Sequence, residues 1–572
     1  MLGEEPALVE KGEEGVGLGA EVEEVEEVLE GVEATTLPNF RLQGSNAAVF
    51  EEEDEDGYYE EDYRDHKVAV IPETVKHFLQ YFYKQIKAKN TDEIVSIYDS
   101  TFSKLSERFY KNSLWPVDSQ IAPLVDNDKS FLILYKELYF RHIYSKREVP
   151  TLQQRFASWQ NYSELFDFLL DPETQNQIDL PLQWLWNIID EFIYQFQTFC
   201  QNRSKLSNKS PEEIQMLKDN PQVWNINAVL NYLERFVQVS NIHQILKQEA
   251  EEEGSSSSHN NRKYTLLEAL GYFSLIGLLR VHCLLGDYHL ALQTLQPIDM
   301  SKKGLFARVA ACQITLYYYV GFAYMMLRRY VDAARLFTNI LIYIGRTKQY
   351  HTRSYQYEQI LKKNKEIYNL LAIVVSLSPQ KIGDDNIHSQ LREKCGEHMA
   401  RIQRGDNSAY AQLFGTACPK FISVAPPDYD DSHDHHQDAR NLQTSVFMEE
   451  VQQQSLIPTV RSYLKLYSTI PVSKLASFVD KDEATFRAFL LRTKHKTHNL
   501  VWSSGEPLRG EWTLGTDVMF HMDQDDMVHI ADTKIARRFG DYFIRHINKF
   551  EHIINQVQRG PSSSGYRGGY RG

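Results

Sequence analysis

Apolar positions between residues 71 and 242 recur at the spacing of α-helices, and the alternation typical of strands is nearly absent there. Within residues 183–197, one stripe steps by 4, 3 and 4 residues and consists of Leu185, Ile189, Phe192 and Phe196. Residues 131–144 are apolar or aromatic on nearly every side, which is typical of a helix enclosed by other helices. The pattern predicts an N-terminal half built of packed helices.

Two tryptophans and two acids share the helix predicted over residues 183–197. A cluster of Trp184, Trp186, Asp190 and Glu191 is compatible with a ligand pocket. Large aromatic side chains dominate helical cores, however, and this makes a core position the better interpretation of both tryptophans. We therefore favour core aromatics beside a solvated acidic face.

The stretch from Leu266 to Ile344 contains two predicted helix pairs with similar residue patterns. Tyr288 and Ala291 of the first pair precede Tyr330 and Ala333 of the second by 42 residues. In each pair an apolar helix ends in a tight turn, and a second helix follows with a small residue where the two cross. This arrangement is typical of helical repeats that stack on their neighbours. The alternative is an ordinary helical hairpin that happens to occur twice.

The second pair resembles a tetratricopeptide repeat. It keeps the spacing of four positions of such a repeat, which are Gly321, Tyr324, Ala333 and Phe337. The proline that normally closes the repeat is missing, and Gly345 stands near that place, so the repeat is degenerate. We expect this pair to join the N-terminal helices to the C-terminal part of one continuous scaffold, and we do not expect a peptide-binding groove within it.

The pattern changes near residue 460. Three short helices are predicted from the apolar sets Val460, Leu464 and Tyr467, then Leu475, Phe478 and Val479, then Phe486, Phe489 and Leu490. Ile470 and Pro471 are expected to turn the chain between the first two helices. Strand-like pieces follow at residues 500–502, 518–522 and 527–530, and residues 523–526 suit a hairpin turn. This order of short helices and a small sheet predicts a winged helix.

A last helix is predicted after Asp532, whose side chain can cap the first turn. Its apolar stripe steps by 4, 4, 4, 3, 4 and 3 residues and consists of Ile535, Phe539, Phe543, Ile547, Phe550, Ile554 and Val557. The stripe runs for about six helical turns, and we expect no later element of the chain to cover it. These seven residues are therefore candidates for a subunit interface.

Charge is concentrated at the N-terminus. Residues 1–66 contain 22 acidic and 3 basic residues, a net charge of −19. The remaining residues contain 59 basic and 55 acidic residues, a net charge of +4, since the whole chain has 62 and 77. An acidic segment of this kind repels itself and buries little apolar surface, so we expect a disordered arm followed by a nearly neutral folded part.

No set of residues predicts an enzyme. The five cysteines include no CxxC pair, which favours free thiols in a reducing compartment. Residues 433–436 (His-Asp-His-His) lie in a loop rich in Asp and Pro, whereas zinc hydrolysis needs at least three preorganised ligands. Phosphate-loop and GxSxG motifs are absent, as are a signal-peptide pattern and an uncharged apolar run of about 18 residues. We expect a cytoplasmic, non-catalytic protein with no cofactor, no metal and no membrane partner.

Two sets of basic residues are candidates for RNA contact. The first lies on and after the third helix of the predicted winged helix and consists of Arg487, Arg492, Lys494 and Lys496. The second consists of Arg559, Arg567 and Arg571 in a tail where Gly and Tyr alternate with Arg, which suits stacking on unpaired bases. In a DNA-binding winged helix the third helix enters the major groove, but Asp480, Asp482 and Glu483 flank its start and repel phosphate. Subunit packing is favoured over nucleic-acid reading, and any RNA contact is expected to be weak.

Helical repeats that lead into a winged helix and a terminal helix resemble the PCI module of the proteasome lid, the signalosome and translation initiation factor complexes. Longer runs are similar to the L-subunit family of eukaryotic translation initiation factor three, and they lie at residues 121–125, 131–144, 183–197, 271–277, 317–347, 499–502 and 529–545. The resemblance implies a non-catalytic scaffold that assembles with other subunits of that factor, subunits E and K among them, through winged-helix edges and C-terminal helices. It also implies a complex that binds the small ribosomal subunit and supports recruitment of initiator tRNA and mRNA. A nucleic-acid-binding adaptor and a subunit of another PCI complex are the alternatives.

The expected fold is therefore mainly α, with a repeat array of tetratricopeptide type, a PCI module that ends in a winged helix, and a long terminal helix. The expected boundaries are an acidic arm at 1–66, N-terminal helical repeats at 67–262 with a polar loop at 249–262, a helix pair at 263–314, a PCI module at 315–532 with its winged helix at about 457–532, a terminal helix at 533–558 and a Gly/Arg-rich tail at 559–572.

Overall fold

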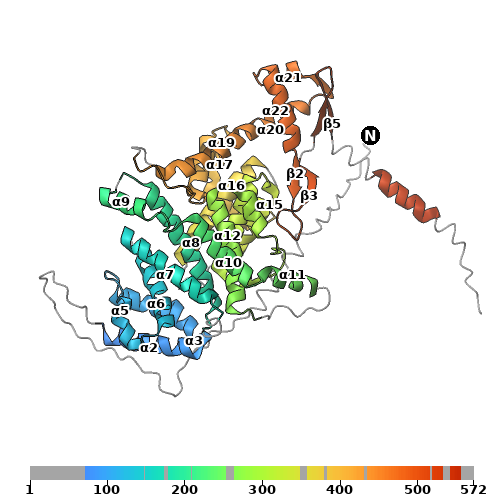
Figure 1. Cartoon of the computed structure of the whole chain (residues 1–572). Coiled ribbons are helices and arrows are strands. Elements are labelled where there is room, and N and C mark those ends of the chain that lie inside the picture. The colour runs from blue at the N-terminus through green and yellow to red at the C-terminus, as the bar shows by residue number, and fades with distance from the viewer. Residues whose placement is uncertain are drawn as a thin grey trace, which may run out of the picture. The chain divides into compact units, whose positions relative to one another are not determined.

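The computed structural model describes residues 71–554, apart from 147, 173–177, 208, 253–262, 348–356, 379–382, 431–434, 516–517 and 533–541. The described residues are helical almost throughout, and the mainly α fold predicted from the sequence is confirmed (Figure 1). The predicted acidic arm and the Gly/Arg-rich tail lie outside the described residues, as does most of the polar loop before the repeats.

The N-terminal half is a succession of helices. They are α2 (Glu73–Ala88), α3 (Thr91–Ser96), a π-helical turn (Ile97–Thr101), α4 (Phe102–Phe109), α5 (Asp118–Ile121), a 3-10 turn (Ala122–Val125), α6 (Lys129–Ser145), α7 (Leu152–Leu170), α8 (Leu182–Ser204), α9 (Pro211–Asp219), α10 (Ile226–Val239) and α11 (Ile242–Glu252). Local signals start several of them. The Asp128 carboxylate accepts two backbone N–H bonds at the start of α6, and Thr151 forms a reciprocal capping box with Gln154 at the start of α7.

Helix α8 confirms the predicted apolar stripe. Its four stripe residues, Leu185, Ile189, Phe192 and Phe196, are buried in the large hydrophobic core. Trp184 and Trp186 are also buried, which confirms that they are core aromatics. The Trp184 ring stacks on Phe82 of α2 and on Tyr98 of the π-helical turn, so α8 packs against both of these early elements.

The predicted solvated acidic face of α8 is wrong. Asp190 pairs with Arg280 on α12 (Leu266–Leu285), and the Arg280 side chain is only 10% exposed. Glu191 accepts a hydrogen bond from Gln195 Nε2 at 3.0 Å. Burial raises the pKa of Glu191 to about 6, although the nearby Arg141 favours the ionised form. These acids face a neighbouring helix, which the pattern along α8 alone does not reveal.

Helix α6 is enclosed on all sides as predicted, and it contains a fully buried acid. The Glu137 side chain is 0% exposed, pairs with Arg141 one turn later and accepts a hydrogen bond from Trp184 Nε1 at 3.0 Å. Burial raises the pKa of Glu137 to about 8, against the opposing effect of the Trp184 hydrogen bond. The core between α6 and α8 therefore includes polar groups that must remain partnered.

A Glu191→Gln change is expected to alter the pH dependence of stability. The pKa of Glu191 is about 6 in the folded chain against an ordinary value of 4.5. Because the folded pKa is raised, this group stabilises the fold below pH 4.5, and that contribution is lost as the pH rises through 6. The shift corresponds to about 2 kcal/mol at most. The stability of Glu191→Gln relative to wild type, measured by urea unfolding, should be higher at pH 7.5 than at pH 4.5 by up to that amount. A stability difference between variant and wild type that is equal at the two pH values would contradict the assignment.

Two helix pairs form the centre of the chain, as the 42-residue repeat predicted. The first is α12 with α13 (Tyr288–Thr294), and the second is α14 (Ala310–Met326) with α15 (Tyr330–Thr347). A 3-10 turn (Leu305–Arg308) connects the two pairs. At the second crossing, a Cβ atom on Gly321 would lie 2.4 Å from the Phe337 ring, so only glycine allows α14 and α15 to pack this closely.

Helix α12 is one of the most apolar elements. Among the described residues it is the one helix whose length and composition would allow a membrane span, and 89% of that stretch is buried inside the protein. Its neighbours in the core are α8 and α10, with which it packs along most of its length (Figure 1). The apolar character of α12 therefore follows from its central place in the helical stack.

The chain continues through α16 (Tyr357–Leu377), α17 (Asp385–Gln403), α18 (Ser408–Ala417), a 3-10 turn (His435–Gln437) and α19 (Asp438–Ser455). Helix α17 ends before Gly405, which has a φ of +91° and so adopts the left-handed conformation that glycine allows without strain.

The predicted winged helix is present, with its own small hydrophobic core. Its elements are α20 (Ile457–Leu464), β1 (Thr469–Pro471), α21 (Val472–Ser477), α22 (Glu483–Lys496), β4 (Val518–Met522) and β5 (Met527–Asp532). The sheet is antiparallel in the order β1-β5-β4, with Pro471 opposite Met527 and Val518 opposite Asp532. The predicted hairpin between the last two strands is confirmed.

Three local expectations differ from the structure. Ile470 and Pro471 belong to the short strand β1 in addition to turning the chain. Proline has no backbone N–H to donate to a neighbouring strand, and it is tolerated here because β1 lies at the edge of the sheet. The strand expected at 500–502 is β2 (His498–Val501), so Trp502 lies outside it, and its partner β3 (Glu511–Leu514) was not predicted. Asp532 is the last residue of β5, and the start of the following helix lies outside the described residues.

Candidate interaction site between the helical repeats and the winged helix

The hairpin of β2 and β3 interrupts the winged helix between α22 and β4. Residues 502–509, which we call the junction loop, connect the two strands and reach the second helix pair. Trp502 at the start of this loop is 4% exposed and belongs to the large core of the repeats, although its neighbours in sequence belong to the winged helix. The loop therefore anchors the winged helix in the hydrophobic core of the helical repeats.

Arg329 holds the junction loop by its backbone. Its guanidinium donates hydrogen bonds to the carbonyl oxygens of Pro507 (2.8 Å), Leu508 (3.3 Å) and Arg509 (3.1 Å). It also pairs with Asp332, one turn into α15, at 2.8 Å. The Arg329 side chain is 6% exposed, so its charge is used almost wholly inside the protein. The planar fork of arginine suits this simultaneous contact with several oxygens.

Asp332 completes the same network. Its two carboxylate oxygens accept the backbone N–H of Trp502 at 2.9 and 3.1 Å, and the side chain is 1% exposed. Burial raises the pKa of Asp332, while Arg329 and the Trp502 N–H favour the ionised form and offset part of that effect. From the preceding helix, the Tyr324 hydroxyl donates to the Pro507 carbonyl at 2.8 Å. The repeat and the loop thus satisfy each other's buried polar groups.

The structure brings the four repeat positions predicted from the sequence to this junction. Tyr324 contacts the loop directly, and Gly321 with Phe337 sets the close packing of α14 against α15. Ala333 is fully buried, and its backbone N–H donates to the Arg329 carbonyl at 3.0 Å. The repeat motif therefore positions the residues that bind the winged helix.

The four basic residues predicted for RNA contact on α22 divide into two kinds. Lys496 pairs with Glu450 on α19 at 2.8 Å, and its side chain is 6% exposed, so burial lowers its pKa. Arg487 pairs with Asp526 in the hairpin turn at 2.7 Å. Arg492 and Lys494 are exposed. Lys496 therefore joins α22 to α19, whereas Arg492, Lys494 and Arg487, whose side chain is 49% exposed, lie at the surface.

The described part of the terminal helix covers residues 542–554, and its apolar side chains are exposed. Phe543, Ile547, Phe550 and Ile554 of the predicted stripe are 58%, 55%, 61% and 52% exposed. The other stripe residues, Ile535, Phe539 and Val557, lie outside the described residues, as do Arg559, Arg567 and Arg571 of the tail. Exposure of this kind along a helix is characteristic of a surface that binds another chain.

The described residues contain no group of three or more His, Cys, Asp or Glu side chains placed to hold a metal ion. His435 lies 2.9 Å from Asp438, and the remainder of the histidine-rich loop, residues 431–434, lies outside the description. The five cysteines are free. Burial raises the pKa of Cys200 to about 12 and that of Cys418 to about 11, which disfavours the nucleophilic thiolate at neutral pH.

Comparison with known proteins identifies the family. The family model described as RNA polymerase I-associated factor PAF67 matches residues 154–550. A protein of Nematostella vectensis named Eukaryotic translation initiation factor 3 subunit L is 50% identical over 492 residues, which cover 85% of this chain and 93% of that protein. The proteins of the same name from Xenopus tropicalis and Homo sapiens are 49% and 48% identical over 526 residues, covering 88% of this chain and 93% of each relative.

The chain belongs to the eukaryotic translation initiation factor 3 subunit L family. The family resemblance found in the sequence is thereby confirmed, and membership makes the chain a subunit of the multisubunit initiation factor 3 complex, which acts in translation initiation. The region matched by the family model begins in α7 and ends in the terminal helix, so it includes the junction loop and the two helices, α14 and α15, that hold it.

Several residues of this subunit L junction were not predicted as functional from the sequence. Arg329, Asp332 and Pro507 form its polar contacts, but Pro507 is separated from the other two by about 175 residues of chain. The one signal in the sequence is an Arg and an Asp three residues apart at a repeat turn, which is normally a solvent-exposed pair. Only the folded chain shows that the loop covers this pair.

Proposed function

We propose that the chain is a non-catalytic scaffold subunit of initiation factor 3 that docks to other subunits through the apolar face of its C-terminal helix. The main support is that Phe543, Ile547, Phe550 and Ile554 share one face of the helix and are each more than half exposed, with Tyr542 and Ile544 exposed beside them. Aromatic and aliphatic side chains in such a row are the usual anchors of helix-to-helix interfaces. Subunits E and K are the proposed neighbours, and the PCI module at 315–532 with its terminal helix at 533–558 is the proposed assembly unit.

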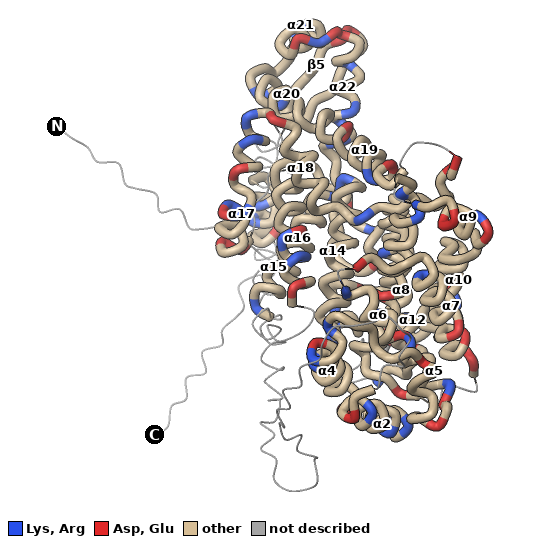
Figure 2. The backbone as a smooth tube through the Cα atoms, turned by 90° about the vertical axis from the view of Figure 1, so that its left-hand side faces the viewer, with Lys and Arg blue, Asp and Glu red and all other residues tan. Residues whose placement is uncertain are grey.

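The proposed role in initiation follows from this scaffold. The junction contacts link the repeats to the winged helix within one subunit. The assembled complex would then bind the small ribosomal subunit and support recruitment of initiator tRNA and mRNA in the cytoplasm. A free nucleic-acid adaptor is less well supported, because Arg487 and Lys496 are engaged by acids of the chain itself. In the view of Figure 2, Lys and Arg are interspersed with Asp and Glu along the described helices.

A Phe543→Asp/Phe550→Asp double change tests the docking helix. Placing two charges in the centre of an apolar interface should reduce co-purification with the other subunits by about tenfold or more. The matched control is Asn548→Asp/His552→Asp, which adds the same charges away from the stripe and should leave assembly unchanged. Assembly is measured by affinity purification and quantitative mass spectrometry from cells that express each variant.

Deletion of residues 533–558 is the larger form of the same test. It should release the chain from the complex, while the circular dichroism and unfolding of the repeats stay as in wild type. Full stoichiometric assembly of the truncated chain would refute the docking role. Loss of RNA crosslinking after charge reversal at Arg492, with assembly intact, would instead favour the adaptor.

A further inference from the structure

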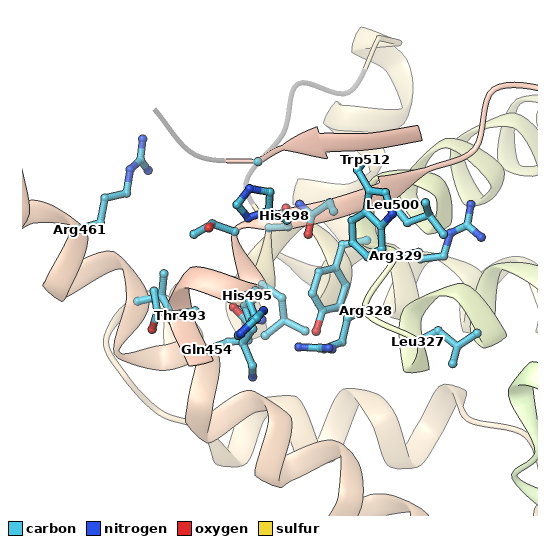
Figure 3. A pocket seen from close by; sticks show the side chains of 18 of the residues that line it. Leu327, Arg328, Arg329, Gln454, Arg461, Thr493, His495, His498, Leu500 and Trp512 are labelled. Atoms are coloured by element: carbon cyan, nitrogen blue, oxygen red, sulfur yellow. The ribbon is translucent and has the colours of Figure 1, made fainter. Parts of the chain in front are cut away.

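A cavity of about 480 Å³ lies beside the junction loop, between the repeat pair and the winged helix (Figure 3). Its walls come from the turn between α14 and α15, from α19 and α20, from the end of α22 and from the hairpin of β2 and β3. Its apolar lining, which we call the floor, includes Leu327, Leu377, Ile457 and Leu500 together with the aromatic side chains of Tyr330 and Phe520. Figure 3 shows Trp512, Leu500 and His498 on the hairpin side, with Arg328, His495 and Gln454 opposite.

The charged side chains that line the cavity are all basic. Among the described residues that line it, none is Asp or Glu, whereas Arg328, Arg461 and the buried cations Arg329 and Lys496 all lie along it. Arg329 and Lys496 are neutralised by the acids that they bind, Asp332 and Glu450. The exposed Arg328 adds positive charge at the rim of the cavity. An apolar floor beneath a basic rim complements a ligand that is both apolar and acidic.

Arg328 occupies a conformation that its side chain does not favour. It has a φ of +63°, and it stands 42 residues after Gly286, which has a φ of +84° in the equivalent turn of the first helix pair. Glycine adopts this left-handed conformation without steric cost, whereas arginine does not. Arg328 thus places a charged side chain at the cavity rim from a turn in which glycine would be unstrained.

The hairpin supplies an open strand edge next to the same cavity. Among the described strands, β3 pairs with β2 alone. Just after β3, the Gly515 N–H donates to the Thr497 carbonyl at 2.8 Å. In an antiparallel pair every second residue directs its backbone groups at the partner strand, so Thr513 and Glu511 also face β2. The backbone groups of the alternate residues, Trp512 and Leu514, therefore point away from β2. Trp512 also lines the cavity, and its side chain is 73% exposed.

We propose that this cavity and the outer edge of β3 form a docking site for an extended acidic peptide segment of another protein, with an apolar side chain anchored in the cavity. The peptide adds as a strand to β3, its anchor fills the floor beside Trp512, and its acids meet Arg328 at the rim. A nucleic acid fits these features less well, because it has no main-chain N–H and C=O groups to complete a strand edge.

The test is a selection of 12-residue peptides displayed on phage against the purified full-length chain, followed by fluorescence anisotropy of the synthetic peptides that are selected. Selected peptides should carry several acids around one large apolar residue. An Arg328→Gly variant should bind them about tenfold more weakly or worse, because it removes the rim charge. Its thermal stability should equal or exceed that of wild type, because glycine relieves the strained turn.

Further variants separate the features of the site. Trp512→Ala should weaken binding to a similar extent, and it removes no core side chain because Trp512 is largely exposed. N-methylation of alternate peptide amides should also weaken binding, since it removes the donors that face β3. Arg392→Glu, a charge reversal at an exposed residue of α17 outside the cavity, is the control and should have no effect.

Three results would overturn the proposal. The first is a selection that yields no peptides or only neutral and basic ones, and the second is binding that Arg328→Gly and Trp512→Ala leave unchanged. The third is a 12-nucleotide oligouridine that binds with Arg328 dependence while no peptide does, which would make the cavity an RNA site. These measurements use the isolated chain, so they are independent of the assembly experiments on the terminal helix.

Discussion

Replacement of Asp332 by alanine is expected to destabilise the chain by about 3–5 kcal/mol, the cost typical of removing one partner from a buried ion pair. The change leaves Arg329, which is 6% exposed, without its counter-charge. It also leaves the Trp502 N–H, which donates to both Asp332 oxygens, without an acceptor. The loss falls on the contact that joins the junction loop to the repeats.

The effect is measured by urea unfolding followed through tryptophan fluorescence, and by hydrogen–deuterium exchange of peptides from residues 498–515. The loop should exchange faster in Asp332→Ala than in wild type. Asp332→Asn keeps an acceptor for Trp502 and should lose less stability. Arg509→Ala is the matched control within the loop, because the Arg509 side chain is 75% exposed and its ion pair is with Glu506 of the same loop, and it should cost no more than about 1 kcal/mol. A cost below about 1 kcal/mol for Asp332→Ala would show that the junction contacts contribute little to the stability of the chain.

A proline at position 333 is the second large prediction, with an expected cost of about 3 kcal/mol or more. The Ala333 N–H donates to the Arg329 carbonyl at 3.0 Å, and proline has no N–H to donate. The proline ring would also displace the Arg329 carbonyl, and the Arg329 guanidinium donates the hydrogen bonds that hold the junction loop. The disturbance therefore passes from the first turn of α15 to the winged helix.

Unfolding of Ala333→Pro is expected to separate into two transitions, since the winged helix has its own hydrophobic core and can unfold apart from the repeats. Ala333→Gly keeps the N–H and should cost only about 1 kcal/mol, with the single transition retained. Differential scanning calorimetry of the three proteins distinguishes these outcomes. One cooperative transition for Ala333→Pro at the wild-type temperature would mean that the repeat does not couple the two parts.

The helical architecture could be predicted because helix formation leaves a local record in the sequence. Apolar positions three and four residues apart must share a face, so the stripe of α8 and the 42-residue helix pairs were visible without any tertiary information. The winged helix was predicted for the same reason, since each of its short helices and the β4–β5 hairpin carries its own pattern. Errors occurred where local pattern and tertiary partner disagree, as in β3, whose four residues are all exposed and which is a strand only by pairing with β2.

The candidate sites were predicted less completely than the fold. The stripe of the terminal helix is periodic, and its described residues are exposed, while the subunit interface proposed for them stays a prediction. The cations of α22 looked equivalent in the sequence, yet Lys496 binds Glu450 on another helix and Arg492 does not. Pairings of this kind depend on distances between elements, and the order of residues along one element carries no record of them.

By itself the sequence determined the class of fold, the order of its parts and the family to which the chain belongs, because these rest on periodic patterns and on long similar runs. Only the tertiary structure decided that Asp190 and Glu191 face a neighbouring helix and that residues 502–509 return to the repeats to cover Arg329 and Asp332. The physical reason is burial. A charged pair that would be solvated on an isolated helix becomes the strongest polar contact of the junction once a distant loop excludes water from it.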